Sequence, residues 1–135
     1  VEKALRATGP LKPVSDHLSR ALELLADKVS PDYRNSIKES ISGVEALCGL
    51  ITGNPKATLG DALKAIRLKP KIEMHPALNK AFDSLYAYTS DAQGIRHALT
   101  EEPKLDQEDA KYMLVACSAF INYLTVKASK AGIKM

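Results

Sequence analysis

Apolar residues in this 135-residue chain recur at intervals of three and four positions along most of its length. That spacing lines them up on one face of an α-helix, whereas a half-buried β-strand needs an apolar residue at every second position. Tryptophan is absent, aromatic residues make up only 5% of the chain, and no segment shows the alternation of a strand. The sequence therefore predicts an all-α domain.

Two amphipathic segments fill the N-terminal half. Residues 13–30, with Pro13 near the start, predict a first helix. Its expected buried stripe consists of Val14, Leu18, Leu22, Leu25 and Val29. Ser30 is the expected cap and Pro31 the expected first residue of a longer second helix, which ends at the Thr-Gly-Asn-Pro sequence of residues 52–55. Its expected stripe consists of Tyr33, Ile37, Ile41, Val44, Cys48 and Ile51.

A short helix and a further long helix follow. Thr58 and Asp61 have the spacing of a capping box and predict the start of the short helix. Its apolar face consists of Leu59, Leu63 and Ile66. The two prolines within residues 67–76 predict a linker, and Pro76 predicts the start of the next helix, which ends near Ser90. The expected stripe of that helix consists of Leu78, Ala81, Leu85 and Tyr88.

The last expected helix starts near residue 106. Leu105 has the position of a hydrophobic staple, Asp106 that of an N-cap, and Asp109 places an acid in the first turn. The expected stripe consists of Ala110, Leu114, Cys117, Phe120, Ile121, Leu124 and Ala128. Four long helices and one short helix predict an antiparallel bundle that forms a single domain over residues 1–135. Because the chain begins with Val1, we expect a processed product or a piece of a longer protein.

Charge and cysteine content narrow the possible functions. The 19 Lys and Arg residues against 16 Asp and Glu give a net charge of +3, which is too small for a protein that coats nucleic acid. Cys48 and Cys117 lie on apolar stripes, so we expect buried, inert thiols and a reducing cytoplasm. His17 and His75 lack companion ligands, so no metal or other cofactor is expected. No apolar run is long enough to cross a bilayer.

The stretch SDAQGIRHALTEEP, residues 90–103, places Arg96 beside His97. Arginine offers a fixed cation to a phosphate and histidine exchanges a proton near neutral pH, so the pair suits metal-free cleavage of RNA. Neighbouring side chains on a helix diverge by about 100°, so both reach one phosphate only at a helix end or across a dimer. The acidic residues Asp91, Glu101 and Glu102 are candidates to orient His97 or to pair with Arg96. The alternative is a polar helix cap with ordinary surface ion pairs.

Other charged residues are candidate binding groups. Arg34 and Lys38 lie one turn apart on the predicted second helix, and a solvated charged face is the alternative interpretation. Two clusters of positive charge either attract an acidic partner or RNA backbone, or serve solubility alone. They consist of Lys64, Arg67, Lys69 and Lys71, and of Lys127, Lys130 and Lys134.

A family resemblance is carried by two stretches, SPDYRNSIKESISGVEALCGLITG at residues 30–53 and SDAQGIRHALTEEPKLDQEDAKYMLVACSAFINYL at residues 90–124. Over roughly residues 30–126 the chain resembles the AbiJ N-terminal-type helical domain of bacterial abortive-infection proteins, which is related to the HEPN class. The resemblance implies a HEPN-like bundle and a role in antiphage defence, and many HEPN proteins are metal-independent RNases that act as dimers. Active HEPN proteins place a histidine after four to six residues that follow the arginine, and at the corresponding positions after Arg96 this chain has Glu101, Glu102 and Pro103.

Three functional hypotheses follow. The first is a cytoplasmic sensing, regulatory or assembly module of a bacterial defence protein whose chemistry lies elsewhere. The second is a HEPN-like ribonuclease in which Arg96 stabilises phosphate and His97 acts as general acid or base. The third is a dimerisation domain that uses the face beside the final helix. A protein partner or a second copy is expected, RNA is a further candidate partner, and no membrane association is expected.

Overall fold

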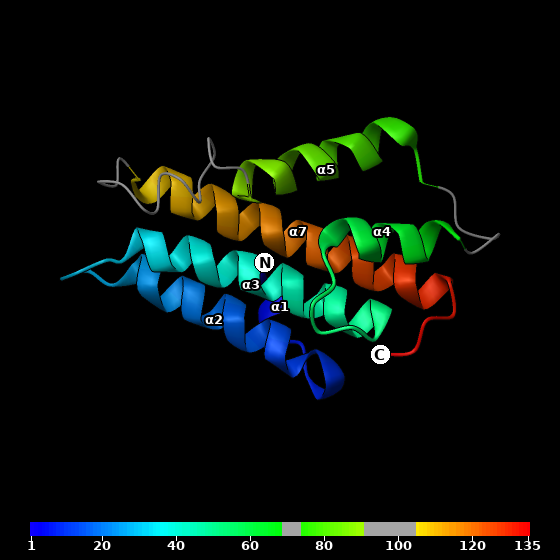
Figure 1. Cartoon of the computed structure of the whole chain (residues 1–135). Helices are drawn as coiled ribbons and strands as arrows, with labels where there is room; N and C mark the ends of the chain where they lie inside the picture. Colours follow the sequence, from blue (N-terminus) through cyan, green and yellow to red (C-terminus); the bar gives the residue numbers. More distant parts are fainter. Residues whose placement is uncertain (69–73, 91–104) are drawn as a thin grey trace.

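The computed structural model describes residues 1–68, 74–90 and 105–135 (Figure 1). A short helix α1 (Glu2–Leu5) and a 3-10 helix (Gly9–Leu11) precede α2 (Lys12–Ala26). The later helices are α3 (Tyr33–Thr52), α4 (Leu59–Arg67), α5 (Pro76–Ser90) and α7 (Gln107–Lys130). The described residues contain helices and no strand, which confirms the predicted all-α class for this part of the chain.

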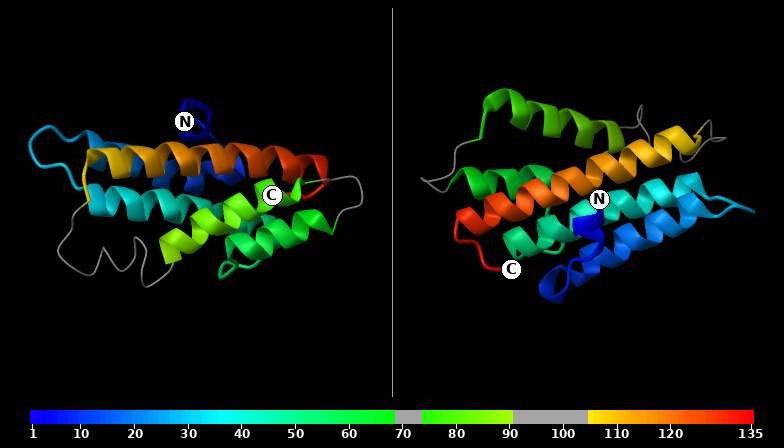
Figure 2. Two further views of the ribbon diagram at one scale, coloured as in Figure 1. Left: turned by 90° about the horizontal axis from the view of Figure 1, so that it is seen from above. Right: turned by 180° about the vertical axis from the view of Figure 1, so that it is seen from behind.

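The helices pack around a central pair. α3 and α7 lie side by side and run in the same direction (Figure 1, Figure 2). α2 packs along one side of α3 in the opposite direction, while α4 and α5 lie on the other side of the pair. The four long helices thus alternate in direction along the chain, yet α3 and α7, which share a direction, are direct neighbours. A HEPN-like arrangement remains an expectation from the resemblance.

α2 ends earlier than its apolar pattern predicts. The Asp27 carboxylate accepts hydrogen bonds from the backbone N–H groups of Val29 and Ser30, at 2.9 and 3.0 Å, and this turns the chain. Val29 is 95% exposed and Leu22 is 39% exposed, so the prediction that both are buried is wrong. The buried stripe consists of Val14, Leu18, Ala21 and Leu25. Leu22 follows Ala21 and therefore lies about 100° away from that stripe.

α3 begins two residues later than predicted. Its cap is Asp32 rather than Ser30, because the Asp32 carboxylate accepts a hydrogen bond from the N–H of Asn35 at 3.0 Å, and Pro31 lies before the helix. At the other end Gly53 has a φ of 74°, which ends α3 at the predicted place. Of the predicted stripe, the buried members are Ile37, Val44, Cys48 and Ile51, and the partly buried members are Tyr33 and Ile41.

The three central helices approach one another closely at Gly43 of α3. A Cβ atom there would lie 3.4 Å from Cδ2 of Leu18 and 3.5 Å from Cδ1 of Ile121, which come from α2 and α7. Ser36, also on α3, is buried and donates a hydrogen bond from Oγ to the carbonyl oxygen of Ala21 at 2.7 Å. Small residues on α3 thus let α2 and α7 pack against its backbone.

The capping box predicted at Thr58 is present, and Asp106, predicted as a simple N-cap, forms a second capping box that was not predicted. Thr58 Oγ1 accepts from the N–H of Asp61 at 3.2 Å, and the Asp61 carboxylate accepts from the N–H of Thr58 at 3.0 Å. Asp106 and Asp109 exchange the corresponding pair of bonds at the start of α7, each at 3.1 Å. The predicted apolar faces of both helices are buried: Leu59, Leu63, Ile66, Ala110, Leu114, Cys117, Phe120, Ile121, Leu124 and Ala128.

α5 covers the predicted residues but turns a different face to the core. Phe82 is buried, and its ring lies edge-on against two aromatic rings of α7, with centroids 4.3 and 5.3 Å away. Leu78 and Ala81 are exposed, so their predicted burial is wrong. Leu85 is partly buried, and the side chain of Tyr88 lies outside the described residues. The aromatic contact, rather than the aliphatic spacing, sets the rotation of α5.

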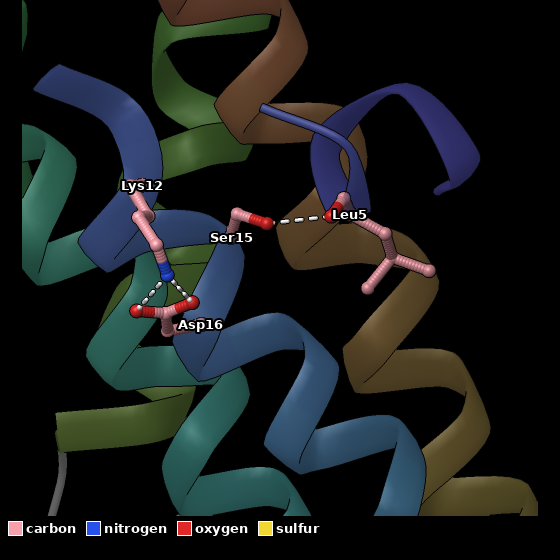
Figure 3. A network of polar contacts seen from close by, with 4 residues as sticks. All are labelled: Leu5, Lys12, Ser15 and Asp16. Carbon is pink, nitrogen blue, oxygen red and sulfur yellow. Dashed lines mark hydrogen bonds and ion pairs between the residues drawn. The ribbon is translucent and has the colours of Figure 1, made fainter. Parts of the chain in front are cut away.

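The sequence analysis did not predict α1, which a side chain of α2 holds in place. The Ser15 hydroxyl donates a hydrogen bond to the carbonyl oxygen of Leu5 (Figure 3). This bond joins two segments separated by a turn of the chain, and Ala4 of α1 is buried. Close by, Nζ of Lys12 lies 2.9 Å from Oδ1 of Asp16, an exposed pair one turn apart on α2 (Figure 3).

Truncation of two leucines one turn apart on α2 tests the observed rotation of this helix. Leu18→Ala should lower the free energy of unfolding by about 2–5 kcal/mol, because it opens a cavity at a fully buried site. Leu22→Ala should lower it by less than about 1 kcal/mol, since Leu22 is exposed. Urea unfolding followed by circular dichroism measures both. Equal losses would show that α2 is rotated away from the observed position.

Candidate functional site

The sequence-predicted catalytic pair is not placed by the structure. Arg96 and His97 lie outside the described residues, as do their candidate partners Asp91, Glu101 and Glu102. Their geometry therefore adds nothing to the sequence argument for RNA cleavage.

Arg34 and Lys38 are exposed on α3, as a solvated charged face predicts. The pKa of Asp32 is lowered, mainly by the hydrogen bonds from Asn35 and to a smaller extent by the nearby positive charge of Arg34. Arg34 therefore lies beside the carboxylate that caps its own helix. The structure gives Arg34 a local electrostatic role and leaves its predicted ligand-binding role a hypothesis.

The two clusters of positive charge are described only in part. Lys64 is exposed on α4, whereas Lys69, Lys71 and the side chain of Arg67 lie outside the described residues. At the other cluster, Nζ of Lys127 lies 5.5 Å from the centroid of the Tyr123 ring on the same helix, and Lys130 and Lys134 are exposed. A cation over an aromatic ring one turn away is a local contact of α7.

His17 and Glu39 form an unpredicted pair between α2 and α3. Nδ1 of His17 lies 2.7 Å from Oε2 of Glu39, at the edge of an open groove of about 570 Å³. The groove is lined by His17, Ser42, Glu45, Ala46, Gly49, Leu50, Gly53 and Pro55. A carboxylate at Nδ1 orients a histidine for proton exchange through Nε2. The side chains of His17 and Glu39 are 39% and 33% exposed, however, and within the described residues no nucleophile is bonded to His17, so the pair resembles an ordinary contact between surface helices.

The two cysteines are buried, as predicted. Burial raises the pKa of Cys48 to about 12, with smaller contributions from the negative charges of Glu45 and Asp61. Burial alone raises the pKa of Cys117 to about 12. Because the thiolate is the reactive form, neither thiol is suited to act as a nucleophile near neutral pH.

Metal and membrane sites receive no support from the described part of the chain. Within residues 1–68, 74–90 and 105–135, no three His, Cys, Asp or Glu side chains gather closely enough to bind a metal ion. His75 instead uses Nδ1 to accept a hydrogen bond from the N–H of Ala77 at 3.0 Å, which caps α5. Among the described helices, none has the length and apolarity that crossing a bilayer requires.

The most unusual surface is on α7. Residues 112–126 contain no Asp, Glu, Lys or Arg, although only one side of this helix packs into the core. On the other side, Tyr112 is 60%, Val115 48% and Val126 42% exposed. We define the α7 outer face as Tyr112, Val115, Ala116, Ala119, Tyr123 and Val126. A helix that is apolar on both sides is expected to be covered on both sides.

Two grooves flank the α7 outer face, and Figure 2 shows α7 running between α5 and α1. The groove beside α5 has a volume of about 390 Å³ and is lined by Ala81, Phe82, Leu85, Tyr112, Ala116, Ala119, Phe120 and Tyr123. The groove beside α1 has a volume of about 400 Å³, with Asn122 and Thr125 of α7 in its wall. The sequence analysis identified only the inner stripe of α7. The signal for the outer face was the absence of charge from residue 112 to residue 126.

Thiol labelling tests the burial of both cysteines. At pH 8, Cys48 and Cys117 should react with a soluble thiol reagent about three orders of magnitude more slowly in the folded protein than in the urea-unfolded one, because a pKa near 12 suppresses the thiolate. A cysteine introduced at the exposed Ser84 of α5 provides the rapid reference. Native labelling of Cys48 or Cys117 at the rate of the Ser84→Cys reference would contradict the structure.

Comparison of the chain with protein-family models, with curated proteins and with solved structures gave no match. The likeness to AbiJ N-terminal-type domains therefore rests on residues 30–53 and 90–124 alone.

Proposed function

We propose that this domain is a helical assembly module that binds a helix of another protein subunit through the α7 outer face. Its biological setting in this proposal is a bacterial abortive-infection protein whose chemistry lies in another part of the system, as the family resemblance implies. The observation that carries the proposal is the uncharged, exposed side of α7, with Tyr112, Val115 and Val126 at its surface.

The composition of the α7 outer face is that of a protein-binding surface. The central parts of protein interfaces are depleted in charge and enriched in aromatic residues, and this face has two tyrosines and no charged residue. Tyr112 and Tyr123 also line the groove beside α5, so the face is ridged rather than flat. A helix laid along α7 would bury the exposed valines and extend into this groove.

Exposure of these residues has a cost that a partner removes. Each fully buried valine-sized side chain contributes roughly 1.5–3 kcal/mol relative to its exposed state, so Val115 and Val126 lose part of this contribution in the isolated chain. Polar residues at the same positions would leave the core unchanged, because the core of α7 is formed by its other side. An interaction surface explains why apolar residues are found there.

The ribonuclease hypothesis is the second candidate, and a direct assay separates it from assembly. Purified protein incubated with mixed RNA in EDTA should give no cleavage above that of the Arg96→Ala and His97→Ala variants. We expect this because Glu101, Glu102 and Pro103 occupy the positions at which the HEPN pattern requires histidine. Gel electrophoresis of the RNA measures the result. Metal-independent cleavage that both substitutions abolish would replace the assembly proposal by the enzyme hypothesis.

Site-specific photo-crosslinking tests the α7 outer face directly in cells that express the protein. A photoreactive amino acid at Val115 should give one discrete adduct identified by mass spectrometry, because this side chain would face the bound helix. The same amino acid at Leu22, which is 39% exposed on α2, is the matched control and should give no discrete adduct. Failure of Val115 to give more adduct than Leu22 would contradict an interface on α7.

A further inference from the structure

We propose that the helix bound by the α7 outer face is α7 of a second copy of this chain, paired antiparallel about a two-fold axis near Ala119. The inference rests on the assembly function proposed above and names the partner. It is drawn from the spacing, exposure and charge of residues along the outer side of α7.

The spacing along α7 is that of a helix–helix seam. Positions 112, 115, 119, 122 and 126 are separated alternately by three and four residues, and this places them along one line of the helix surface. Tyr112, Val115, Ala119 and Val126 on this line are exposed, and Asn122 is partly exposed. The inner stripe that packs into the core is separate from this line, so α7 carries two seams.

Side-chain size along the seam is compatible with two-fold pairing about Ala119. In an antiparallel pair, a residue a given number of positions before Ala119 faces the residue the same number of positions after it in the other copy. Tyr112 then lies opposite Val126, seven positions from the centre on either side. Val115 lies opposite Tyr123 at four positions; Tyr123 is beside the seam, and its ring also packs against Phe82 of α5. The seam residue Asn122 lies opposite Ala116 at three positions. Each tyrosine meets a valine, and the small Ala119 side chains meet at the centre, where the helices are closest.

The charges at the ends of the seam select the antiparallel orientation. Glu108 and Lys130 are exposed, continue the seam beyond its apolar part, and lie eleven positions before and after Ala119. In a parallel pair, Glu108 would face Glu108 and Lys130 would face Lys130. In the antiparallel pair, each Glu108 faces the partner's Lys130 and attracts it. Lys111 and Lys127 face each other beside the seam, but a parallel pair has as many lysine–lysine oppositions, so these do not favour either orientation. A second copy of α7 therefore provides both the apolar residues and the end charges that the pairing uses.

The available area sets the expected strength. α7 has 24 residues and is therefore about 36 Å long, so a seam about 10 Å wide offers roughly 700 Å² over two copies before the flanking grooves contribute. The seam alone is smaller than specific interfaces, which bury about 1,200–2,000 Å², so the flanking grooves have to add to the buried area and the association is weak. We therefore expect a dimer in exchange with monomer at micromolar concentration.

Analytical ultracentrifugation of the full chain between about 1 and 300 µM tests the pairing. The wild-type mass should rise with concentration from that of one chain to that of two, and Val115→Lys should remain monomeric. Glu108→Lys and Lys130→Glu should each weaken association about tenfold, since each replaces two attractions by two repulsions. The double variant should regain wild-type affinity, and an equimolar mixture of the two single variants should associate more strongly than either alone.

Gln107→Lys is the control, because it places a lysine in the same turn of α7 but off the seam, and its affinity should equal that of the wild type. Circular dichroism verifies that each variant is folded. A dimer without the charge-swap rescue would overturn the antiparallel register, and a dimer that survives Val115→Lys would overturn the choice of face. A chain that stays monomeric at all concentrations would overturn self-pairing. In that case a crosslink from Val115 to another protein would leave the assembly function standing, whereas no discrete crosslink would reject both.

Discussion

The close approach of three helices at Gly43 is the constraint on which the fold depends. Leu18 from α2 and Ile121 from α7 contact α3 where it has no side chain, and a Cβ atom at this position would lie at ordinary contact distance from both. Any larger side chain would have to displace one of the two neighbouring helices. α2 and α7 both pack against α3 here, and the side of α7 opposite this contact points outward.

The sequence was sufficient to predict where a helix begins when a capping residue is followed three positions later by an acidic residue that can bond back to it. The predicted capping box at Thr58 is present, and Asp106 is the predicted N-cap, although its reciprocal bond with Asp109 was not predicted. The junction after α2 was harder because Asp27, Ser30 and Asp32 are all residues that cap or turn a helix. The choice between them depends on how α2 and α3 pack, and apolar spacing within one segment does not contain that information.

The rotation of a helix about its axis could also not be predicted from apolar spacing alone. Leu22 belongs to a plausible apolar series, yet the buried line of α2 passes through the smaller Ala21, which lets the backbones approach. On α5 the predicted aliphatic series was replaced by Phe82, because aromatic rings on α7 provide its partners. In both cases a neighbouring helix determines which residue is buried.

At the candidate site, too, some features could be predicted from the local sequence and others only from the packing of the helices. Arg96 and His97 could be identified from the sequence because the chemistry of each side chain is known without its surroundings. Both lie outside the described residues, so RNA cleavage by this pair stays a hypothesis. The α7 outer face carries no reactive group and became visible only when burial separated the inner seam from the outer one. The sequence shows that residues 112–126 carry no charge, but the meaning of this depends on knowing that Tyr112, Val115 and Val126 of α7 are exposed.

The charge pattern of α7 connects the stability of the helix with its proposed pairing. Acidic residues at the start of a helix and basic residues at its end interact favourably with the helix dipole, and α7 has Glu108 and Asp109 in its first turn and Lys127 and Lys130 in its last. A helix charged in this way presents opposite signs at its two ends. When its middle is uncharged, an antiparallel copy of itself is a partner that satisfies both ends and covers the apolar residues between them. The features that stabilise α7 within one chain thus also favour its association with a second.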